Sequence, residues 1–109
     1  MLKEDLLKAA GKMFDVHPRD ITGPSRFEFL LPVRFALYKA LSLRGWTQAR
    51  IGTFMNRDRS SVRYGIARAE HMMERDENFA VKVSMLAVMK PEQIITVTEK
   101  EQEKEEVDD

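Results

Sequence analysis

Apolar residues recur at every third or fourth position through most of this chain, and strand-like alternation is almost absent. This spacing lines the apolar side chains along one face of a helix, and that face must pack against another element to leave water. The pattern predicts helices over residues 2–14, from Pro32 to near Gly45, from Gln48 to Met55, from Asp58 past Met73, and from Asn78 to Met89. We therefore expect an all-α fold, a small helical bundle.

Prolines and glycines mark the ends of these segments. The stretch HPRDITGPSR, residues 17–26, holds two prolines and a glycine and is predicted to be a turn or short loop. Pro32 suits the first turn of a helix, and Pro91 is expected to end the last one. The segment QIITVT, residues 93–98, is the single strand-like stretch, and docking on the bundle, pairing with another chain and a loose conformation all remain open for it.

Length and composition limit the number of domains and the available chemistry. A chain of 109 residues suits one compact domain, here residues 1–90, followed by a linker and tail at 91–109. No apolar run approaches the roughly 20 residues that cross a bilayer, so no membrane partner is expected. Cysteine is absent, which excludes disulfide scaffolds, thiolate zinc sites and cysteine nucleophiles. His17 and His71 have no further ligand at metal-binding spacing, so we expect surface or capping histidines, no metal, no cofactor and no enzymatic activity.

Charge is distributed unevenly along the chain, although the formal net charge is zero. Between residues 44 and 68 there are six arginines and one acid, whereas residues 99–109 hold seven acids and two lysines. The basic middle of the chain suits an anionic partner. The acidic end contains one apolar residue and is expected to be a disordered tail, because it cannot bury enough surface to become ordered.

A short helix, a tight turn and a longer helix are predicted in the basic middle of the chain. Thr47 can cap the helix from Gln48 to Met55, and Trp46 has the spacing of a hydrophobic staple with Ile51. The polar residues 56–58 favour a turn, and the last of them can cap the next helix. This order of elements is the helix-turn-helix plan, predicted here at about residues 47–75.

The second helix of this pair can bury one face and expose a basic one. Val62 would pack across the bend against Ile51, and Gly52 would allow the two helices to approach closely. Its apolar positions recur every three or four residues, at Val62, Ile66, Ala69 and Met73. Burial of this stripe turns polar residues outward or towards the flanks, namely Arg59, Ser60, Arg63 and Arg68. Arginine can donate two hydrogen bonds to a guanine edge in the major groove, and serine can contact bases or phosphates.

The run IGTFMNRDRSSVRYGIARAE resembles the signature of the carboxy-terminal DNA-binding domain of the DnaA family, the bacterial replication initiators. That family has an Ile-Gly pair followed by Arg-Asp-His-Thr-Thr-Val, and here Ile51-Gly52 and residues 57–62 occupy the matching places. The similarity covers roughly residues 5–88. It implies a helical bundle like domain IV of DnaA, with a helix-turn-helix of the Trp-repressor-like type.

The resemblance also implies roles for residues that match the family's motif. Arg57 would contact phosphate, and Asp58 would contact a base amino group or serve as a cap. The groove contacts would come from Arg59, Ser60 and Ser61, with Arg63 among the DNA-binding residues. Phosphates would be held by Thr47, Gln48 and the backbone of Ala49. Arg26 is the candidate for reading the adjacent minor groove.

Two features differ from the family pattern. The loop GPSRFEFLL offers Arg26 alone beside Glu28 and large apolar residues, where the family has several basic residues. Arg59 stands in place of the family's histidine, and serines replace threonines, which removes methyl groups that could touch thymine. No GxxxxGK[ST] phosphate loop is present, so no nucleotide-driven motor is expected.

The sequence thus predicts a protein that binds double-stranded DNA with sequence preference, in transcription regulation or the control of replication initiation. We expect it to act in the cytoplasm at the nucleoid, with a monomer favoured and a replication or transcription protein left open as a further partner. The alternative is a protein-interaction module that keeps an initiator-like fold and has lost most of its affinity for duplex DNA. Its support is the depleted basic loop, the apolar FEFLL segment and the acidic tail.

Overall fold

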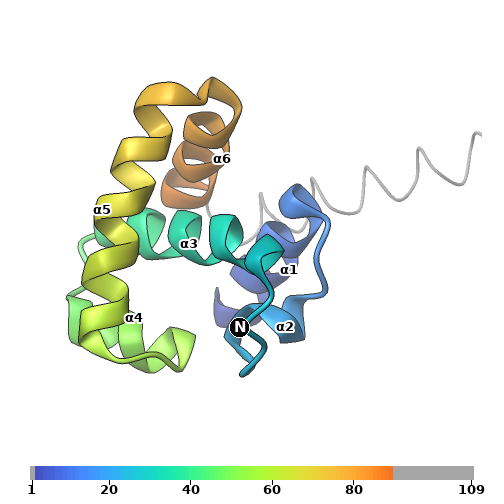
Figure 1. Cartoon of the computed structure of the whole chain (residues 1–109), viewed down its shortest axis with the longest axis vertical. Coiled ribbons are helices and arrows are strands. Elements are labelled where there is room, and N and C mark those ends of the chain that lie inside the picture. Colours follow the sequence, from blue (N-terminus) through green and yellow to red (C-terminus); the bar gives the residue numbers. More distant parts are fainter. Residues whose placement is uncertain (1, 90–109) are drawn as a thin grey trace, which may run out of the picture.

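The computed structural model describes residues 2–89, and this part of the chain contains six α-helices, one 3-10 turn and no strand (Figure 1). The elements are α1 (Leu2–Phe14), α2 (Pro18–Thr22), the 3-10 turn η1 (Glu28–Leu30), α3 (Leu31–Leu43), α4 (Gln48–Met55), α5 (Arg59–Arg75) and α6 (Glu77–Val88). The all-α prediction is confirmed for the described residues. The predictions for residues 91–109, including the segment 93–98 and the acidic tail, lie outside them.

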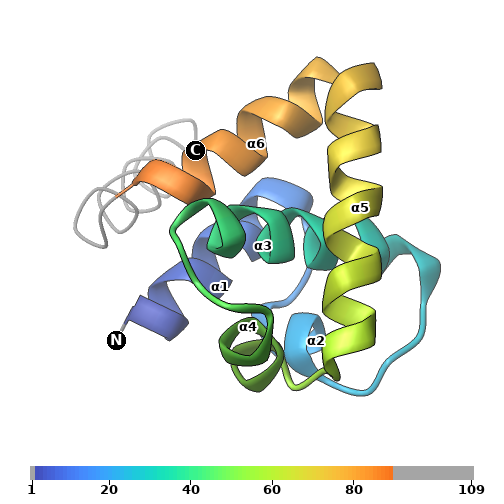
Figure 2. The ribbon, with the colours of Figure 1, turned by 90° about the vertical axis from the view of Figure 1, so that its left-hand side faces the viewer.

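Helix α3 lies across the middle of the molecule, and the other long helices pack around it (Figures 1 and 2). Eight of its thirteen residues are buried, and the exposed ones, Leu31 and Leu43, lie at its two ends. The core contains fully buried side chains from α3, from the short α2 and from every other long helix. They include Leu6, Ile21, Leu37, Leu41, Ile51, Met55, Val62, Val83 and Leu86. Each buried side chain of this size contributes about 1.5–3 kcal/mol. The core therefore fixes the positions of α4 and α5 relative to α3.

Most of the predicted helix boundaries are confirmed. Helix α1 spans the predicted residues 2–14, and α3 carries its proline in the first turn. Gly45 follows the end of α3 with φ +90, a left-handed conformation that glycine adopts without steric cost. Helix α6 begins one residue earlier than predicted, because the side chain of Asp76 accepts a hydrogen bond from the Phe79 amide at 3.1 Å and so caps the helix.

The prediction of a simple turn or loop over residues 17–26 is wrong in one respect. Helix α2 occupies the middle of this stretch, with the proline at its first turn. His17 caps it, since its Nδ1 accepts a hydrogen bond from the Arg19 amide at 3.2 Å. Ile21 is fully buried and holds α2 on the core. A helix of five residues is too short to show a periodic pattern, so proline and glycine dominated the local signal.

The carboxyl end of α2 is held by a buried arginine of α3. The Arg34 side chain donates from Nε to the Ile21 carbonyl at 2.9 Å, and from Nη2 to the carbonyls of Asp20 at 2.9 Å and Gly23 at 3.2 Å. These are the carbonyls that a helix end leaves without partners. Burial, and then the nearby Arg57, lower the pKa of Arg34 from its ordinary value. The carbonyl oxygens compensate for burying this charge.

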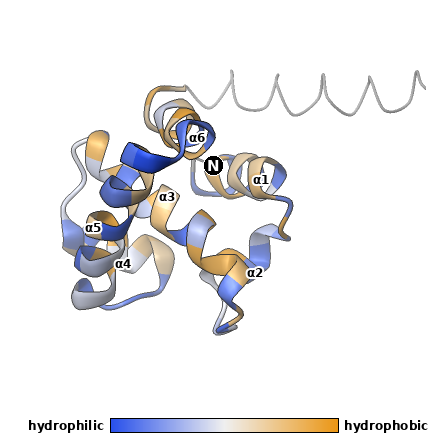
Figure 3. Cartoon of the chain, turned by 45° about the horizontal axis from the view of Figure 1, so that its top comes forward, coloured by the Kyte–Doolittle hydropathy of each residue, from blue (hydrophilic) through white to orange (hydrophobic). Residues whose placement is uncertain are grey.

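Helix α5 crosses α3 closely at Gly65. A Cβ atom at this position would overlap the ring of Tyr38, which is itself 3% exposed. Only a residue without a side chain allows this approach. Figure 3 shows hydrophilic and hydrophobic residues alternating along α5, as expected for a helix with one buried face. Its buried positions are Val62, Gly65 and Ala69.

Candidate nucleic-acid interface

Helices α4 and α5 are joined by a tight turn of three residues, 56–58. At the start of α4 the Thr47 Oγ1 accepts a hydrogen bond from the Arg50 amide at 3.1 Å, as the sequence predicts. At its end Asn56 has φ 57 and ψ 47, the left-handed conformation that asparagine tolerates better than most residues. The Arg57 amide then donates to the Gly52 carbonyl at 2.9 Å, which closes the turn.

Gly52 allows this turn to close, rather than chiefly allowing the two helices to approach each other. A Cβ atom on Gly52 would lie 2.6 Å from the Arg57 carbonyl oxygen, whereas the nearest atom of α5 is the Val62 Cγ2 at 3.8 Å. The close neighbour is therefore the backbone of the turn. Trp46, at the other end of α4, is half-buried and has a structural role, since its ring packs edge-on against Phe54 with centroids 5.3 Å apart.

Asp58 caps the amino terminus of α5. Its Oδ1 accepts hydrogen bonds from the Ser61 amide, at 3.2 Å, and from the Ser61 hydroxyl. The hydroxyl bond first, and then the amide bond, hold the pKa of Asp58 below its ordinary value. Because both the amide and the hydroxyl of Ser61 donate hydrogen bonds to Asp58, this pair orders the first turn of α5. The cap was one of the two roles expected for Asp58.

The Arg57 side chain is bound to backbone carbonyls of the protein. Its Nη2 donates to the Gly23 carbonyl at 2.6 Å and its Nη1 donates to the Asn56 carbonyl at 2.9 Å, with the carbonyls of Met55 and Thr22 at 3.4 and 3.5 Å. Arg57 thus connects the turn before α5 to the end of α2. A phosphate at Arg57 would compete with these bonds.

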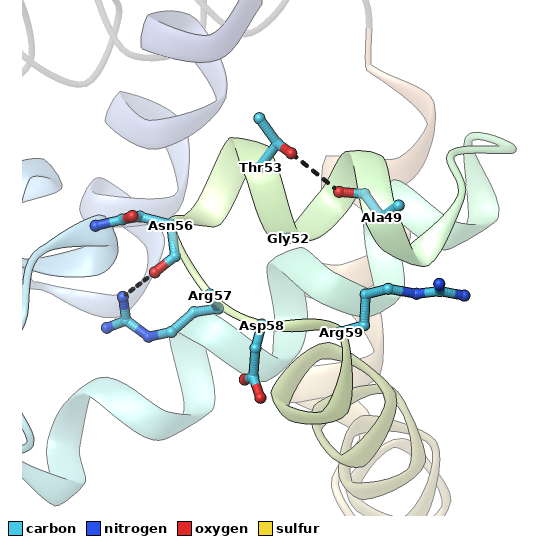
Figure 4. A pocket seen from close by; sticks show the side chains of 7 residues that line it. All are labelled: Ala49, Gly52, Thr53, Asn56, Arg57, Asp58 and Arg59. Carbon is cyan, nitrogen blue, oxygen red and sulfur yellow. Dashed lines mark hydrogen bonds between the residues drawn. The ribbon is translucent and has the colours of Figure 1, made fainter.

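An open depression of about 550 Å³ lies between α4 and the start of α5. Figure 4 shows its lining, which consists of Ala49, Gly52, Thr53, Asn56, Arg57, Asp58 and Arg59. The side chains of Arg57 and Arg59 leave the turn in opposite directions (Figure 4). Arg59 is exposed, whereas Arg57 is half-buried and turned towards the carbonyl of Asn56.

The structure brings together some of the residues that the sequence selects. Ala49, Arg57, Asp58 and Arg59 line the depression, and Thr47 and Gln48 begin the helix that forms one wall of it. Ser60 and Arg63 are exposed on α5, and Ser61 is half-buried in its bond to Asp58. Arg26 is exposed in the connection between α2 and η1, outside the depression.

Sequence reasoning missed three positions at this surface. Tyr64 is 62% exposed one helical turn after Ser60, with its ring against Phe35 at 6.1 Å, and the spacing of four residues is the signal that could have found it. Thr53 and Asn56 line the depression. Thr53 could have been found by its spacing from Ala49, since its hydroxyl donates to the Ala49 carbonyl at 3.2 Å.

No protein-family model matches the chain, and no curated protein matches it either. Among the described residues, no group of three or more histidine, aspartate or glutamate side chains is placed to hold a metal ion. Over the same part of the chain, no helix has the length and apolar character that crossing a membrane requires.

Proposed function

We propose that the chain binds double-stranded DNA in a sequence-dependent manner, with α4, the turn 56–58 and α5 acting as a helix-turn-helix. The observation that carries the proposal is the exposed polar start of α5, where Arg59, Ser60 and Arg63 project beside a tight turn and an open depression. The resemblance of residues 51–70 to the DnaA carboxy-terminal domain supports the same function.

In this proposal α5 enters the major groove with its first turns. A helix has a diameter of about 10–12 Å with its side chains, and the major groove is about 12 Å wide. Arg59 is exposed at the first helical position and can donate two hydrogen bonds to guanine O6 and N7. Arg63 lies one turn further along the same exposed face and extends the contact.

Phosphates would be held at the amino ends of the two helices. The partial positive charge of a helix amino terminus attracts anions, and α4 presents the exposed residues Thr47 and Ala49 there. The bonds with Ser61 hold the pKa of Asp58 below its ordinary value, and its second oxygen can accept a hydrogen bond from a cytosine amino group. We assign Arg57 mainly to holding the turn, because its guanidinium is bonded to carbonyls.

A DNA reader of this kind regulates transcription or the initiation of replication by occupying its site. It would share the DNA-binding helices of an initiator. The sequence holds no phosphate-binding loop of the GxxxxGK[ST] type, so we propose no nucleotide-driven step for it. The cytoplasm at the nucleoid is the corresponding place of action.

A second candidate function is a protein-interaction module with an initiator-like fold. The observation that favours it is the exposed apolar pair Phe27 and Phe29, which flanks Glu28 in a loop where the resemblance implies several basic residues. Salt dependence separates the two functions. Duplex binding through several phosphates weakens steeply as salt rises, whereas apolar association does not.

The test is selection of binding sites from a random duplex pool, with the wild-type chain, Arg59→Ala and Arg75→Ala in parallel. Arg75 is exposed at the other end of α5 and serves as the matched control for loss of one positive charge. We expect a short motif from the wild type and the control, and a loss of about 1–3 kcal/mol with relaxed specificity for Arg59→Ala. Failure of the wild type to enrich any duplex at low salt would refute the proposal.

A further inference from the structure

Two phenylalanines stand exposed and stacked in the connection between α2 and α3, residues 23–30. Phe27 and Phe29 are 66% and 60% exposed, and their rings lie nearly parallel with centroids 5.6 Å apart and an interplanar angle of 19°. Leu31 beside them is 41% exposed. A contiguous apolar patch of this kind marks a contact site, because exposure to water is unfavourable unless a partner covers it.

The pair is presented by an ordered turn. Leu30 is fully buried, and its amide donates to the Phe27 carbonyl at 3.0 Å within η1. The turn leads directly into α3, the central helix of the core. Leu30 thus anchors the two rings to the core. A partner can bind them without the entropy cost of ordering a flexible segment.

The chain is tied to the start of α5 on both sides of this connection, through the turn before α5 on one side and through Phe35, in the following helix α3, on the other. At one end the Gly23 carbonyl accepts a hydrogen bond from Arg57 at 2.6 Å, and at the other the ring of Phe35 meets that of Tyr64 at 6.1 Å. From Arg59, the first residue of α5, to Tyr64 the helix rises only about 8 Å. Residues 23–31 can span about 27 Å when extended, so the connection bows outward beside α5, as Figure 2 shows.

We propose that Phe27 and Phe29 form an apolar wedge that contacts the DNA next to the groove filled by α5, by stacking on a base step or packing on deoxyribose. This inference rests on the proposed function. Because α5 occupies the full width of the major groove, a loop beside its first turns lies over the bordering backbone and the next minor groove. Phenylalanine inserted between base steps from the minor groove unstacks them and bends the duplex.

The arginines on the neighbouring face of α5 favour DNA over a protein partner, because within the loop itself the exposed Arg26 and Glu28 have opposite charges. Arg26 is exposed next to Phe27 and suits a phosphate, and the exposed Arg59 and Arg63 lie on the α5 face that we assign to the duplex. A protein seated on the two rings would occupy the space that the duplex needs. Glu28 is also exposed and repels phosphate, so the effect of its charge on affinity depends on how closely the loop approaches the DNA backbone.

The first experiment compares the wild type, the double variant Phe27→Ala/Phe29→Ala, and the control Val81→Ala/Val88→Ala. The two control valines are 51% and 76% exposed on α6, so the control removes a similar exposed apolar surface elsewhere. The probes are a random-sequence 30-bp duplex and the site enriched by the wild type, with affinity measured by anisotropy and bending by energy transfer between end labels. We expect the double variant to bind about tenfold more weakly and to bend the site less, with the control unchanged.

A second variant uses the charge of the loop. Glu28→Gln is expected to bind the same duplex about 2- to 3-fold more tightly at low salt, whereas Glu74→Gln, exposed near the far end of α5, should leave affinity unchanged. Wild-type affinity and bending in the phenylalanine double variant would overturn the wedge and leave the proposed function standing. If sedimentation shows that the wild type is a dimer and that only the phenylalanine double variant is a monomer, the two rings contact a second copy of the chain and the wedge is overturned. Absence of duplex binding by the wild type would overturn both proposals.

Discussion

Replacement of Arg57 tests whether this arginine stabilises the fold or binds a phosphate. Arg57→Ala removes the side chain that joins the turn before α5 to the end of α2 through the carbonyls of Asn56 and Gly23. The Gly23 carbonyl keeps its bond from Arg34, at 3.2 Å, whereas the Asn56 carbonyl can turn to water. The loss is therefore that of the hydrogen bonds, without a buried group left unpaired.

The magnitude follows from the geometry of these bonds. The bonds to Gly23 and Asn56 are 2.6 and 2.9 Å long, while those to Met55 and Thr22, at 3.4 and 3.5 Å, are too long to count. A net contribution of about 1 kcal/mol for each short bond gives a loss of about 2 kcal/mol in the free energy of unfolding. In a domain of this size that lowers Tm by about 8–16 °C. Arg57→Lys should lose most of the same stability, since one ammonium cannot reach both carbonyls as the planar guanidinium does.

The assay is urea and thermal unfolding followed by far-UV circular dichroism, with duplex affinity measured on the same samples. Arg59→Ala is the matched control, because Arg59 is exposed two residues away, and its stability should stay within about 0.5 kcal/mol of the wild type. Equal stability of Arg57→Ala and Arg59→Ala would refute the structural role. A loss of duplex affinity without a loss of stability would return Arg57 to the phosphate role that the resemblance implies.

Two further predictions concern the packing and the capping of α5. Gly65→Ala should destabilise the fold by about 2 kcal/mol, because the overlap with the buried Tyr38 ring outweighs the gain of about 1 kcal/mol in helix propensity. Urea unfolding checks this, the added substitution Tyr38→Leu should restore part of the loss, and a rise in Tm for Gly65→Ala would contradict it. The depressed pKa of Asp58 stabilises the fold above its unfolded-state pKa, near pH 4, and this stabilisation is lost as pH falls through the lower folded-state value. Asp58→Asn should therefore show a smaller fall in Tm between neutral and acid pH, and an unchanged acid dependence would refute the role of the bonds to Ser61.

The parts of the fold that depend on neighbouring residues could be predicted from the sequence. The start of α4 and the start of α5 follow from Thr47 and Asp58, whose side chains accept hydrogen bonds from amides three residues further on. The caps, the turn at 56–58 and the exposure of Arg59 are local in this sense. Helix α2 was missed because it is short and depends on burying Ile21 against the rest of the chain.

The remaining features depend on contacts between distant parts of the chain. Arg34 reaches carbonyls 11 to 14 residues back, and Arg57 reaches the Gly23 carbonyl 34 residues back. In sequence both look like ordinary basic residues among helical positions. The need for glycine at position 65 likewise comes from the ring of Tyr38, on another helix. No periodic or local pattern contains this information, because it arises only when α3 brings these segments together.

The division of tasks among residues 57–63 has a consequence for the DNA binding that we propose. Arg57 is bonded to the Gly23 carbonyl, the exposed Asp58 is bonded to Ser61 as the cap of α5, and Val62 is fully buried. The positions between them, Arg59, Ser60 and Arg63, face outward. Variation at these three outward positions alters the contact surface and leaves the scaffold intact, so a library randomised there should yield folded proteins with many different preferences. Within these seven residues, the positions that can change the contacts are different from the positions that hold the fold.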